Sequence, residues 1–256
     1  MLYQSIAYLK WLPKTFHLHG IHSPFIFNLE KDVLRGKNNT KTSQQLATYR
    51  TSLLVSNEEI DVTDYGSGSR VFTSNKRSVK KIAKVAGATP KKALLLERLI
   101  AYFKPLKTLE LGTSLGIATA ALSINNENVV YTIEGCPNTA AIAQQYLDKA
   151  NITTPKITIG DFKNELSAFK NEALDFIYFD GNHSKEATLS YVKTLLPTIT
   201  EKTVWFFDDI HWSLEMTIAW DIIKKTPEIS ATIDCFWFGM VFFRPGQAKE
   251  DFYVRL

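Results

Sequence analysis

Two short stretches in the second half of the chain carry side chains that are able to do chemistry. VWFFDDIHW places Asp208, Asp209 and His211 after four apolar residues, and FIYFDGNH places Asp180 and His183 after a second apolar run. Carboxylates and imidazoles at the tip of a hydrophobic strand are costly to desolvate unless a partner offsets the cost. The partner can be a metal ion, a substrate proton or a neighbouring backbone group, and these two stretches keep all three open.

The elements that must position these residues alternate regularly from about residue 89 onward. Thr89 is a candidate N-cap, Pro90 stands in the first turn, and the apolar spacing of residues 89–103 predicts a helix. Buried strands and helices then alternate along the chain, the strands being LKTLELG, VVYTIEG, KITIGDF, LDFIYFDG and TVWFFDD, before a closing pair of strand-like runs in ISATIDCFWFGMVFF. This order predicts an α/β fold with a mostly parallel sheet covered by helices on both faces.

Acidic residues follow each of the five predicted strands. Because ligands of open α/β sheets bind at the carboxyl ends of the strands, this edge is the place to look for a site. Any single acidic residue there can be a helix N-cap, but five at one edge favour a shared ligand. They are Glu110, Glu134, Asp161, Asp180 and Asp208.

A glycine-rich turn, ELGTSLG, follows the first of these strands. Gly112 and Gly116 are spaced G-x-x-x-G, which differs from the G-x-G-x-x-G turn that binds a dinucleotide pyrophosphate. Such a turn brings backbone N–H groups close to a ligand. Glu134 ends the next strand, where an acidic residue can accept hydrogen bonds from two ribose hydroxyls, and Asp161 can accept from an exocyclic amine.

The motifs ELGTSLG, TIEG, GDF and FIYFDGNH resemble the successive motifs of class I S-adenosylmethionine-dependent methyltransferases over residues 90–243. The resemblance implies a Rossmann-like methyltransferase fold, which is a doubly wound, seven-stranded, mostly parallel sheet with a terminal antiparallel strand. It also implies S-adenosylmethionine as the cofactor. The residues implied to bind it are Glu110, Gly112, Thr113, Ser114, Gly116, Glu134, Gly135, Asp161, Phe162 and Asp180.

The pair FIYFDGNH and FFDDIHW resembles more specifically the small-molecule O-methyltransferases of catechol and macrocin type. In these enzymes a divalent metal binds carboxylates at the two strand ends, and the matching residues here are Asp180, Asp208 and Asp209. Catechol-type enzymes have Asp-Asn where this chain has Asp-Asp, as the macrocin type does. The implied reaction is methyl transfer to a hydroxyl oxygen of a small molecule.

The acidic cluster has more than one interpretation. Three carboxylates repel one another by about 1 to 4 kcal/mol per pair at 4 Å, so a cation such as Mg²⁺, Mn²⁺ or Ca²⁺ can lie between them, or one of them stays protonated. An acid pair that orients substrate without metal and plain helix capping are the alternatives. A bound cation would lower the pKa of the acceptor hydroxyl. The candidate catalytic residues are Asp180, His183, Asp208 and His211, with either histidine as the proton acceptor.

Residues 1–88 follow no regular pattern and are expected to form a mostly helical or irregular extension or lid, whereas residues 89–256 form the cofactor-binding domain. HLHGIHSPF carries His17, His19 and His22 and is most simply a docked N-terminal arm, with closure over the pocket or a zinc site as alternatives. The turn DVTDYGSGSR, residues 61–70, resembles a first nucleotide-binding turn, but no strand with an acidic end follows it at the right distance. We interpret it as a structural or lid loop.

Composition limits the classes of function. The 256 residues are 45% hydrophobic and 22% charged, with a net charge of +4, and the lysines form no basic stripe, so a nucleic-acid partner is not expected. No apolar run is long enough to span a membrane, the start of the chain lacks signal-peptide features, and two cysteines make no disulfide framework. We expect a cytoplasmic protein with a small hydroxylated substrate. The oligomeric state stays open, with a homodimer as one candidate.

Two other functions remain to be distinguished. A catalytically inactive cofactor-binding module would keep the fold but tolerate replacement of the aspartates. A nicotinamide-dependent oxidoreductase is disfavoured because the G-x-G-x-x-G turn is missing.

Overall fold

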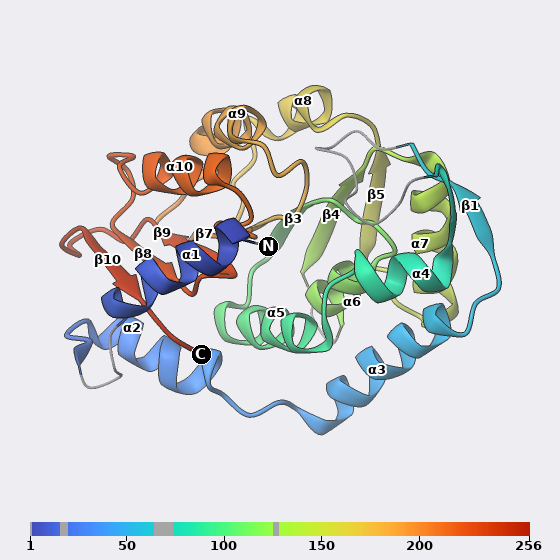
Figure 1. Cartoon of the computed structure of the whole chain (residues 1–256), viewed down its shortest axis with the longest axis horizontal. Coiled ribbons are helices and arrows are strands. Elements are labelled where there is room, and N and C mark those ends of the chain that lie inside the picture. The colour runs from blue at the N-terminus through green and yellow to red at the C-terminus, as the bar shows by residue number, and fades with distance from the viewer. Residues whose placement is uncertain (1, 16–19, 64–73, 125–127) are drawn as a thin grey trace. The chain divides into compact units, whose positions relative to one another are not determined.

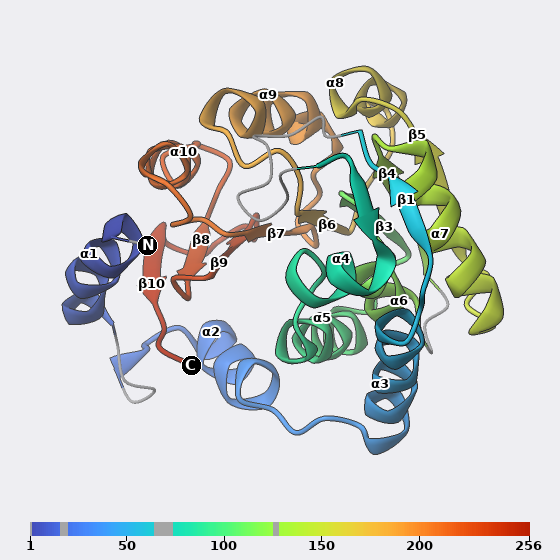
Figure 2. The ribbon, with the colours of Figure 1, turned by 45° about the vertical axis from the view of Figure 1, so that its right-hand side comes forward.

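The computed structural model describes residues 2–15, 20–63, 74–124 and 128–256. The chain divides into two compact units, of which unit 1 comprises residues 1–35 and 166–256 and unit 2 comprises residues 36–165. Figures 1 and 2 show the elements of both. This division does not coincide with the boundary expected near residue 88, because a helix from the segment without a regular pattern packs inside unit 2.

Three parallel strands form the centre of unit 2, in the order β3 (Lys107–Leu111), β4 (Val129–Glu134) and β5 (Pro155–Ile159). All three were expected from their apolar runs. The register pairs Leu111 with Ile133, and Glu134 with Ile159. The residues that follow the three strands therefore meet at one edge, as the sequence predicts for parallel strands.

Helices surround these strands. The helix predicted over residues 89–103 is confirmed as α5 (Pro90–Phe103), with the Thr89 hydroxyl accepting from the Lys92 N–H at 3.2 Å. The other helices of unit 2 are α3 (Thr40–Leu54), α4 (Val79–Val85), α6 (Ile117–Ser123), α7 (Pro137–Lys149) and α8 (Phe162–Glu165), and a two-stranded antiparallel sheet pairs β1 (Glu59–Asp61) with β2 (Lys76–Ser78). Helix α3 is 15 residues long and contacts α5, α6 and α7, although the sequence pattern did not reveal it.

The strands of unit 1 run in the order β6 (Phe176–Phe179), β7 (Val204–Asp208), β9 (Phe238–Phe242), β8 (Ala231–Asp234) and β10 (Glu250–Tyr253). Strands β6 and β7 are parallel, while β9 is antiparallel to both β7 and β8. The expected reversed strand is thus confirmed. Strand β10, parallel to β8, was not predicted, and it raises the number of strands from β3 to β10 to eight among the described residues, one more than expected.

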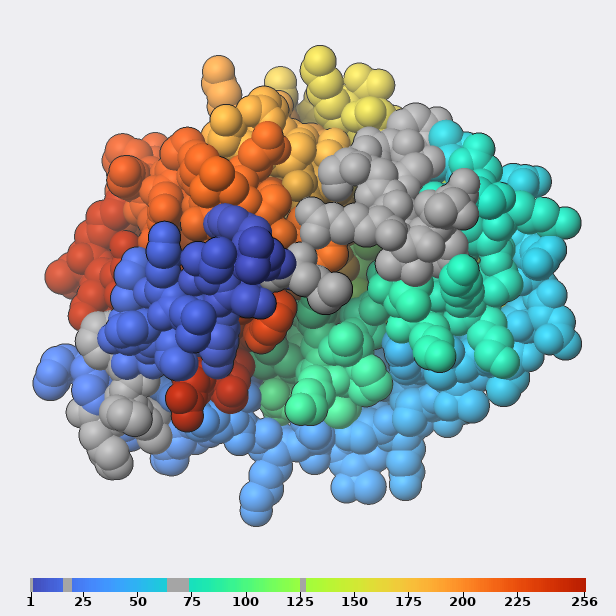
Figure 3. Space-filling model, in the orientation of Figure 1, coloured from blue at the N-terminus to red at the C-terminus, as the bar shows by residue number. Residues whose placement is uncertain are grey.

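The helices of unit 1 are α1 (Leu2–Trp11), α2 (Pro24–Leu29), α9 (Lys185–Leu195) and α10 (Leu214–Ile223), with short helical turns at Leu12–Lys14, Glu30–Leu34, Leu166–Phe169 and Leu196–Thr198. Figures 1 and 2 show α9 and α10 side by side along the strands. Helix α1, dark blue in Figure 3, is joined to α10 by a 2.6 Å hydrogen bond from the Tyr3 hydroxyl to Thr217. Ser23, which precedes Pro24, is extended and caps α2.

The described part of the chain holds no helix whose length and apolar character would suit a membrane span. Cys136 and Cys235 are buried free thiols.

Candidate functional site

The glycine turn of unit 2 connects β3 to α6 through three residues with positive φ. Gly112, Ser114 and Gly116 have φ values of 103°, 48° and 73°, and glycine reaches this region at little cost. A Cβ at Gly116 would lie 2.7 Å from the Tyr49 hydroxyl oxygen. The turn is therefore restricted in two ways at Gly116, by its backbone torsion and by a residue of α3 that packs against it.

Glu134, the predicted ribose-binding residue, lies against this turn. Its Oε2 accepts from the Ser114 N–H at 2.8 Å, and its Oε1 accepts from the Cys136 N–H at 2.9 Å. The carboxylate is half-buried. Both carboxylate oxygens of Glu134 are thus fixed beside the turn by backbone donors.

Gly135 and Asp161 belong to the same edge of unit 2. Gly135 lies between Glu134 and Cys136 in the chain. The N–H of Gly160 donates to the Glu134 carbonyl at 3.0 Å. Asp161 is exposed and its Oδ1 accepts from the Lys163 N–H at 2.7 Å. It therefore has the helix-capping contact that the sequence left as an alternative, and half-buried Phe162 follows it directly.

Glu110 lies inside the unit, and this differs from the expected cofactor contact. Its side chain is fully buried, and its Oε2 accepts from the hydroxyls of Thr119 at 2.5 Å and Thr132 at 2.6 Å. Its Oε1 has no hydrogen-bond partner in the described part of the chain. Burial in a low-dielectric interior raises the pKa of Glu110 to about 8, so the side chain is mostly a neutral acid at pH 7.

Thr113, also expected to face the cofactor, belongs to the same buried network. Its hydroxyl lies 2.6 Å from the Thr132 hydroxyl, and its side chain is buried. Glu110 and Thr113 thus hold the glycine turn to β4 from beneath. Because both side chains are buried, they support the turn rather than line its open side.

Asp180 and Asp208, the acidic pair of unit 1, follow neighbouring parallel strands. The register pairs Phe179 with Phe207, so the next residues on each strand are the two aspartates. The Tyr178 hydroxyl lies 2.9 Å from Asp180 Oδ2 and 3.0 Å from Asp208 Oδ2. The structure therefore brings the two carboxylates to one hydroxyl group, which has a single proton to donate.

Tyr178 is the residue that sequence reasoning missed. It is fully buried in β6 and packs edge-on against Phe206 at 5.4 Å. A signal was present, because side chains two apart on a strand share a face. The only polar side-chain atom of FIYF stands two residues before Asp180, so it had to point to the side of the sheet that carries the carboxylate.

Asp209 was expected to complete a three-carboxylate metal site. It has a left-handed backbone, with φ of 53°, and its N–H donates to the Trp237 carbonyl at 2.8 Å and to Asp208 Oδ1 at 3.0 Å. Across residues 2–15, 20–63, 74–124 and 128–256, no group of three or more His, Cys, Asp or Glu side chains is placed to hold a metal ion. The structure thus brings Asp180 and Asp208 together without the third ligand.

The two candidate histidines differ in their surroundings. His183 is half-buried, with Nε2 3.8 Å from Asp180 Oδ1. His211 is buried, with Nδ1 3.0 Å from the Thr217 hydroxyl and Nε2 3.0 Å from Asp234 Oδ2. Both ring nitrogens of His211 are used inside unit 1, so its side chain joins the loop after β7 to α10 and β8 rather than facing a substrate.

The candidate residues of the N-terminal segment contribute little to the site. His17 and His19, and the turn residues Asp64, Gly66 and Gly68, lie outside the described residues. His22 is exposed. Phe25 packs edge-on against Phe242 at 5.0 Å, beneath the Arg244 guanidinium at 4.3 Å, so the aromatic ring of this arm is used within unit 1.

Comparisons with known proteins agree with this geometry. Residues 109–210 match the model of a family described as a methyltransferase domain. This segment, which contains the glycine turn and the strand-end residues Asp180 and Asp208, is therefore similar to methyltransferase domains. No curated protein matches the chain.

Solved structures share the fold. The SAH-bound methyltransferase PaMTH1 of Podospora anserina is 14% identical, with a TM-score of 0.60 over 88% of this chain and 97% of that one. An O-methyltransferase of Bacillus cereus in complex with SAH is 17% identical, with a TM-score of 0.56 over 84% and 96%. The O-methyltransferase TomG of Streptomyces achromogenes, in complex with SAM, is 12% identical, with a TM-score of 0.56 over 85% and 95%. At these identities the likeness establishes the fold.

Proposed function

We propose that this protein transfers the methyl group of S-adenosylmethionine to a hydroxyl oxygen of a small molecule. The observation that carries the cofactor half is the Glu134 carboxylate, which is held between the N–H groups of Ser114 and Cys136 at the mouth of the glycine turn. An acceptor fixed by two backbone donors is preorganised, so it can bind a ribose diol without further ordering. The methyltransferase domain match over residues 109–210 supports the same cofactor.

Calorimetric titration with S-adenosylhomocysteine tests this half of the proposal. We expect a Kd in the low micromolar range or tighter, and at least tenfold weaker binding by Glu134→Ala. Glu59→Ala, at an exposed position of β1, is the matched control and should bind like the unchanged protein. Absence of binding at millimolar ligand would overturn the proposal.

His183 is proposed as the group that accepts the proton of the acceptor hydroxyl. As the C–S bond of the sulfonium breaks and the new C–O bond forms, the hydroxyl proton passes to the imidazole, and the sulfur leaves as a neutral thioether. The Asp180 carboxylate, with Oδ1 3.8 Å from His183 Nε2, lies beside this imidazole. The assignment of the acceptor to unit 1 rests on the sequence resemblance and on the geometry inside that unit.

The proposal also includes a divalent metal ion. Mg²⁺ is often bound in proteins by one or two carboxylates with water and substrate completing the shell, so the pair Asp180 and Asp208 fits such an ion without Asp209. When bound, the ion would supply a lower pKa to the acceptor hydroxyl. Calorimetric titration with Mg²⁺ should give a binding heat that Asp208→Asn abolishes, and equal heats in both proteins would remove the metal from the proposal.

The oxygen specificity and the catalytic role of the acids are tested together. With a panel of catechols and other small hydroxylated compounds, methyl transfer should fall by at least a hundredfold in His183→Ala and in Asp180→Asn, while S-adenosylhomocysteine affinity changes by less than threefold in His183→Ala. If neither variant lowers the rate on any accepted substrate, the acidic pair is not catalytic. If the protein binds the cofactor and methylates nothing, it is a cofactor-binding module.

A further inference from the structure

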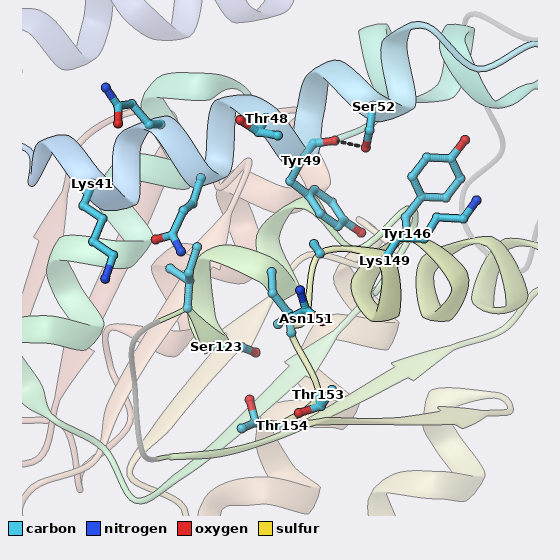
Figure 4. A pocket seen from close by; sticks show the side chains of 15 residues that line it. Lys41, Thr48, Tyr49, Ser52, Ser123, Tyr146, Lys149, Asn151, Thr153 and Thr154 are labelled. Carbon is cyan, nitrogen blue, oxygen red and sulfur yellow. Dashed lines mark hydrogen bonds between the residues drawn. The ribbon is translucent and has the colours of Figure 1, made fainter.

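Helix α3 places one tyrosine against the glycine turn of unit 2. Tyr49 lies in this helix, outside residues 109–210, which match the family model. Figure 4 shows the Tyr49 ring pointing away from α3, toward the layer of α6 and α7. The side chain is buried, and its hydroxyl donates to the Leu115 carbonyl at 2.8 Å. Leu115 lies between Ser114 and Gly116, so this bond reaches the centre of the turn.

The peptide group between Leu115 and Gly116 is held at both of its polar atoms. Its carbonyl accepts from Tyr49, and its N–H, which belongs to Gly116, donates to the Thr113 carbonyl at 2.8 Å. Because a peptide group is planar, fixing both atoms fixes the orientation of the whole group. This orientation sets the torsions on either side of it, among them the φ of 73° at Gly116.

Gly116 in turn leaves room for the Tyr49 hydroxyl. A Cβ at this position would lie 2.7 Å from the hydroxyl oxygen, so the phenol reaches the carbonyl because residue 116 has no side chain. Burial raises the pKa of Tyr49 above its ordinary value, and the hydroxyl therefore keeps the proton that it donates. Tyr49 supplies the donor, and Gly116 supplies the space that the donor needs.

Helix α3 is anchored firmly enough to hold the turn. Leu46 and Leu53, three residues before and four residues after Tyr49, are buried on the same face of the helix. Arg50 Nη1 donates to the Ala88 carbonyl at 3.0 Å, which ties the helix to the segment before α5. The Tyr49 ring is thus fixed on both sides along α3.

The pinned peptide group lies next to the contact that holds Glu134. The N–H of Ser114, the residue before Leu115, donates to Glu134 Oε2 at 2.8 Å. Ser114 has a left-handed φ of 48°, and a residue with a side chain keeps such a torsion only where its surroundings enforce it. A peptide group fixed one residue further along the chain provides this enforcement.

From these contacts we propose that Tyr49 is a positioning residue of the cofactor site. It acts through the peptide group of Leu115 and Gly116 on the Ser114 N–H, and through that N–H on the Glu134 carboxylate. Helix α3 is then a working part of the cofactor site and not only a cover over the domain. The inference rests on the proposed cofactor function, and one of its tests needs no cofactor.

Calorimetric titration of Tyr49→Phe with S-adenosylhomocysteine measures the contribution of the hydroxyl. This change keeps the ring and removes one hydrogen bond, so we expect about fivefold weaker binding. Tyr146→Phe is the matched control, because it removes a hydroxyl of the same unit that donates to Glu58 at 3.1 Å, away from the turn. It should change the Kd by less than twofold. Unchanged affinity in Tyr49→Phe, or equal losses in both variants, would overturn the proposal.

Leu46→Ala separates positioning from stability. It leaves a cavity in the packing of α3, so the urea midpoint should fall further than in Tyr49→Phe, whereas the Kd for S-adenosylhomocysteine should change by less than twofold. If affinity instead follows stability in the two variants, Tyr49 has a structural role alone and the proposal is wrong.

A double-mutant cycle tests the route through Glu134. In the Glu134→Ala background the carboxylate that Tyr49 positions is gone, so adding Tyr49→Phe should weaken S-adenosylhomocysteine binding by less than twofold. An undiminished further loss would mean that Tyr49 acts on the cofactor by another path, and the proposed route would fail.

Amide hydrogen exchange of Ser114, measured by NMR on the unliganded full chain, tests the turn without any cofactor. We expect exchange at least fivefold faster in Tyr49→Phe, because the turn opens more often, and no change in Tyr146→Phe. Equal rates in Tyr49→Phe and the unchanged protein would overturn the proposal. If S-adenosylhomocysteine does not bind the unchanged protein, the cofactor function fails, while the exchange rates still decide whether Tyr49 holds the turn.

Discussion

The two acidic centres of this protein are held by different kinds of partner. In unit 2, Glu134 is fixed by the backbone N–H groups of Ser114 and Cys136. In unit 1, Asp180 and Asp208 share the hydroxyl of one side chain, Tyr178. Backbone donors are present whatever the side chains are, whereas a hydroxyl is lost with one substitution. Unit 2 should therefore be sensitive to changes of backbone torsion, and unit 1 to removal of a single oxygen.

The largest effect is expected from Gly116→Ala, which changes the backbone of the glycine turn in unit 2. The new Cβ must be accommodated at a φ of 73° and meets the Tyr49 hydroxyl at 2.7 Å, so we expect about 3 to 5 kcal/mol of lost stability and at least tenfold weaker S-adenosylhomocysteine binding. Chemical denaturation and calorimetry measure both.

Gly246→Ala is the control, because Gly246 has a similar φ of 74° and a Cβ at this position would meet nothing within 4 Å. It isolates the torsional cost at about 1 kcal/mol. The double variant Gly116→Ala with Tyr49→Phe should recover part of the loss by removing the clashing oxygen. Equal costs at both glycines would show that contact with Tyr49 does not restrict the turn.

A pH-dependent change of stability is expected from Glu110, which supports the glycine turn from beneath. Its folded pKa, about 8, is raised above the ordinary 4.5 by burial, so the native state binds more protons than the unfolded chain between these values. Its stabilising contribution is complete below about pH 4.5 and is lost as the pH rises through 8, with a slope of up to about 1.4 kcal/mol per pH unit.

Glu110→Gln, which mimics the neutral acid, should remove this part of the pH dependence. The measurement is urea denaturation of both proteins at about pH 5, 6.5 and 8, which spans the range between the two pKa values. Parallel stability curves for the two proteins would mean that Glu110 is already ionised in the folded state, and that unit 2 tolerates a buried charge under its turn.

The smallest effect is expected from Tyr178→Phe, which removes the side-chain hydroxyl that holds the aspartates of unit 1. It leaves two adjacent carboxylates without their shared donor, at a cost of about 1 to 2 kcal/mol in unfolding free energy. Tyr191→Phe is the control and should cost less, because the Tyr191 hydroxyl accepts a longer bond, 3.3 Å, from the Asn182 amide. An increase of stability in Tyr178→Phe would show that the carboxylates are held by other groups.

Predictions from sequence succeeded where one local pattern decided the outcome. The apolar runs placed β3 to β9, and Thr89 capped α5. Parallel pairing then brought Glu134 to the glycine turn, because the ends of neighbouring parallel strands share one edge. Helix α3 was missed, since its exposed polar face hides the apolar spacing of Leu46, Tyr49 and Leu53.

The chemistry of each acidic residue was decided by the tertiary structure. Asp161 accepts from its own helix and Glu110 is buried among threonines 9 and 22 residues away, although the sequence predicts both at the end of a strand. His211 meets Asp234, and Tyr49 meets Leu115, through contacts that no spacing predicts. The positions of the strands and the residues at their ends follow from the local sequence, which sets the backbone torsions and the hydrophobic pattern. Burial and hydrogen-bond partners, which set protonation and role, depend on segments that become neighbours only when the chain folds.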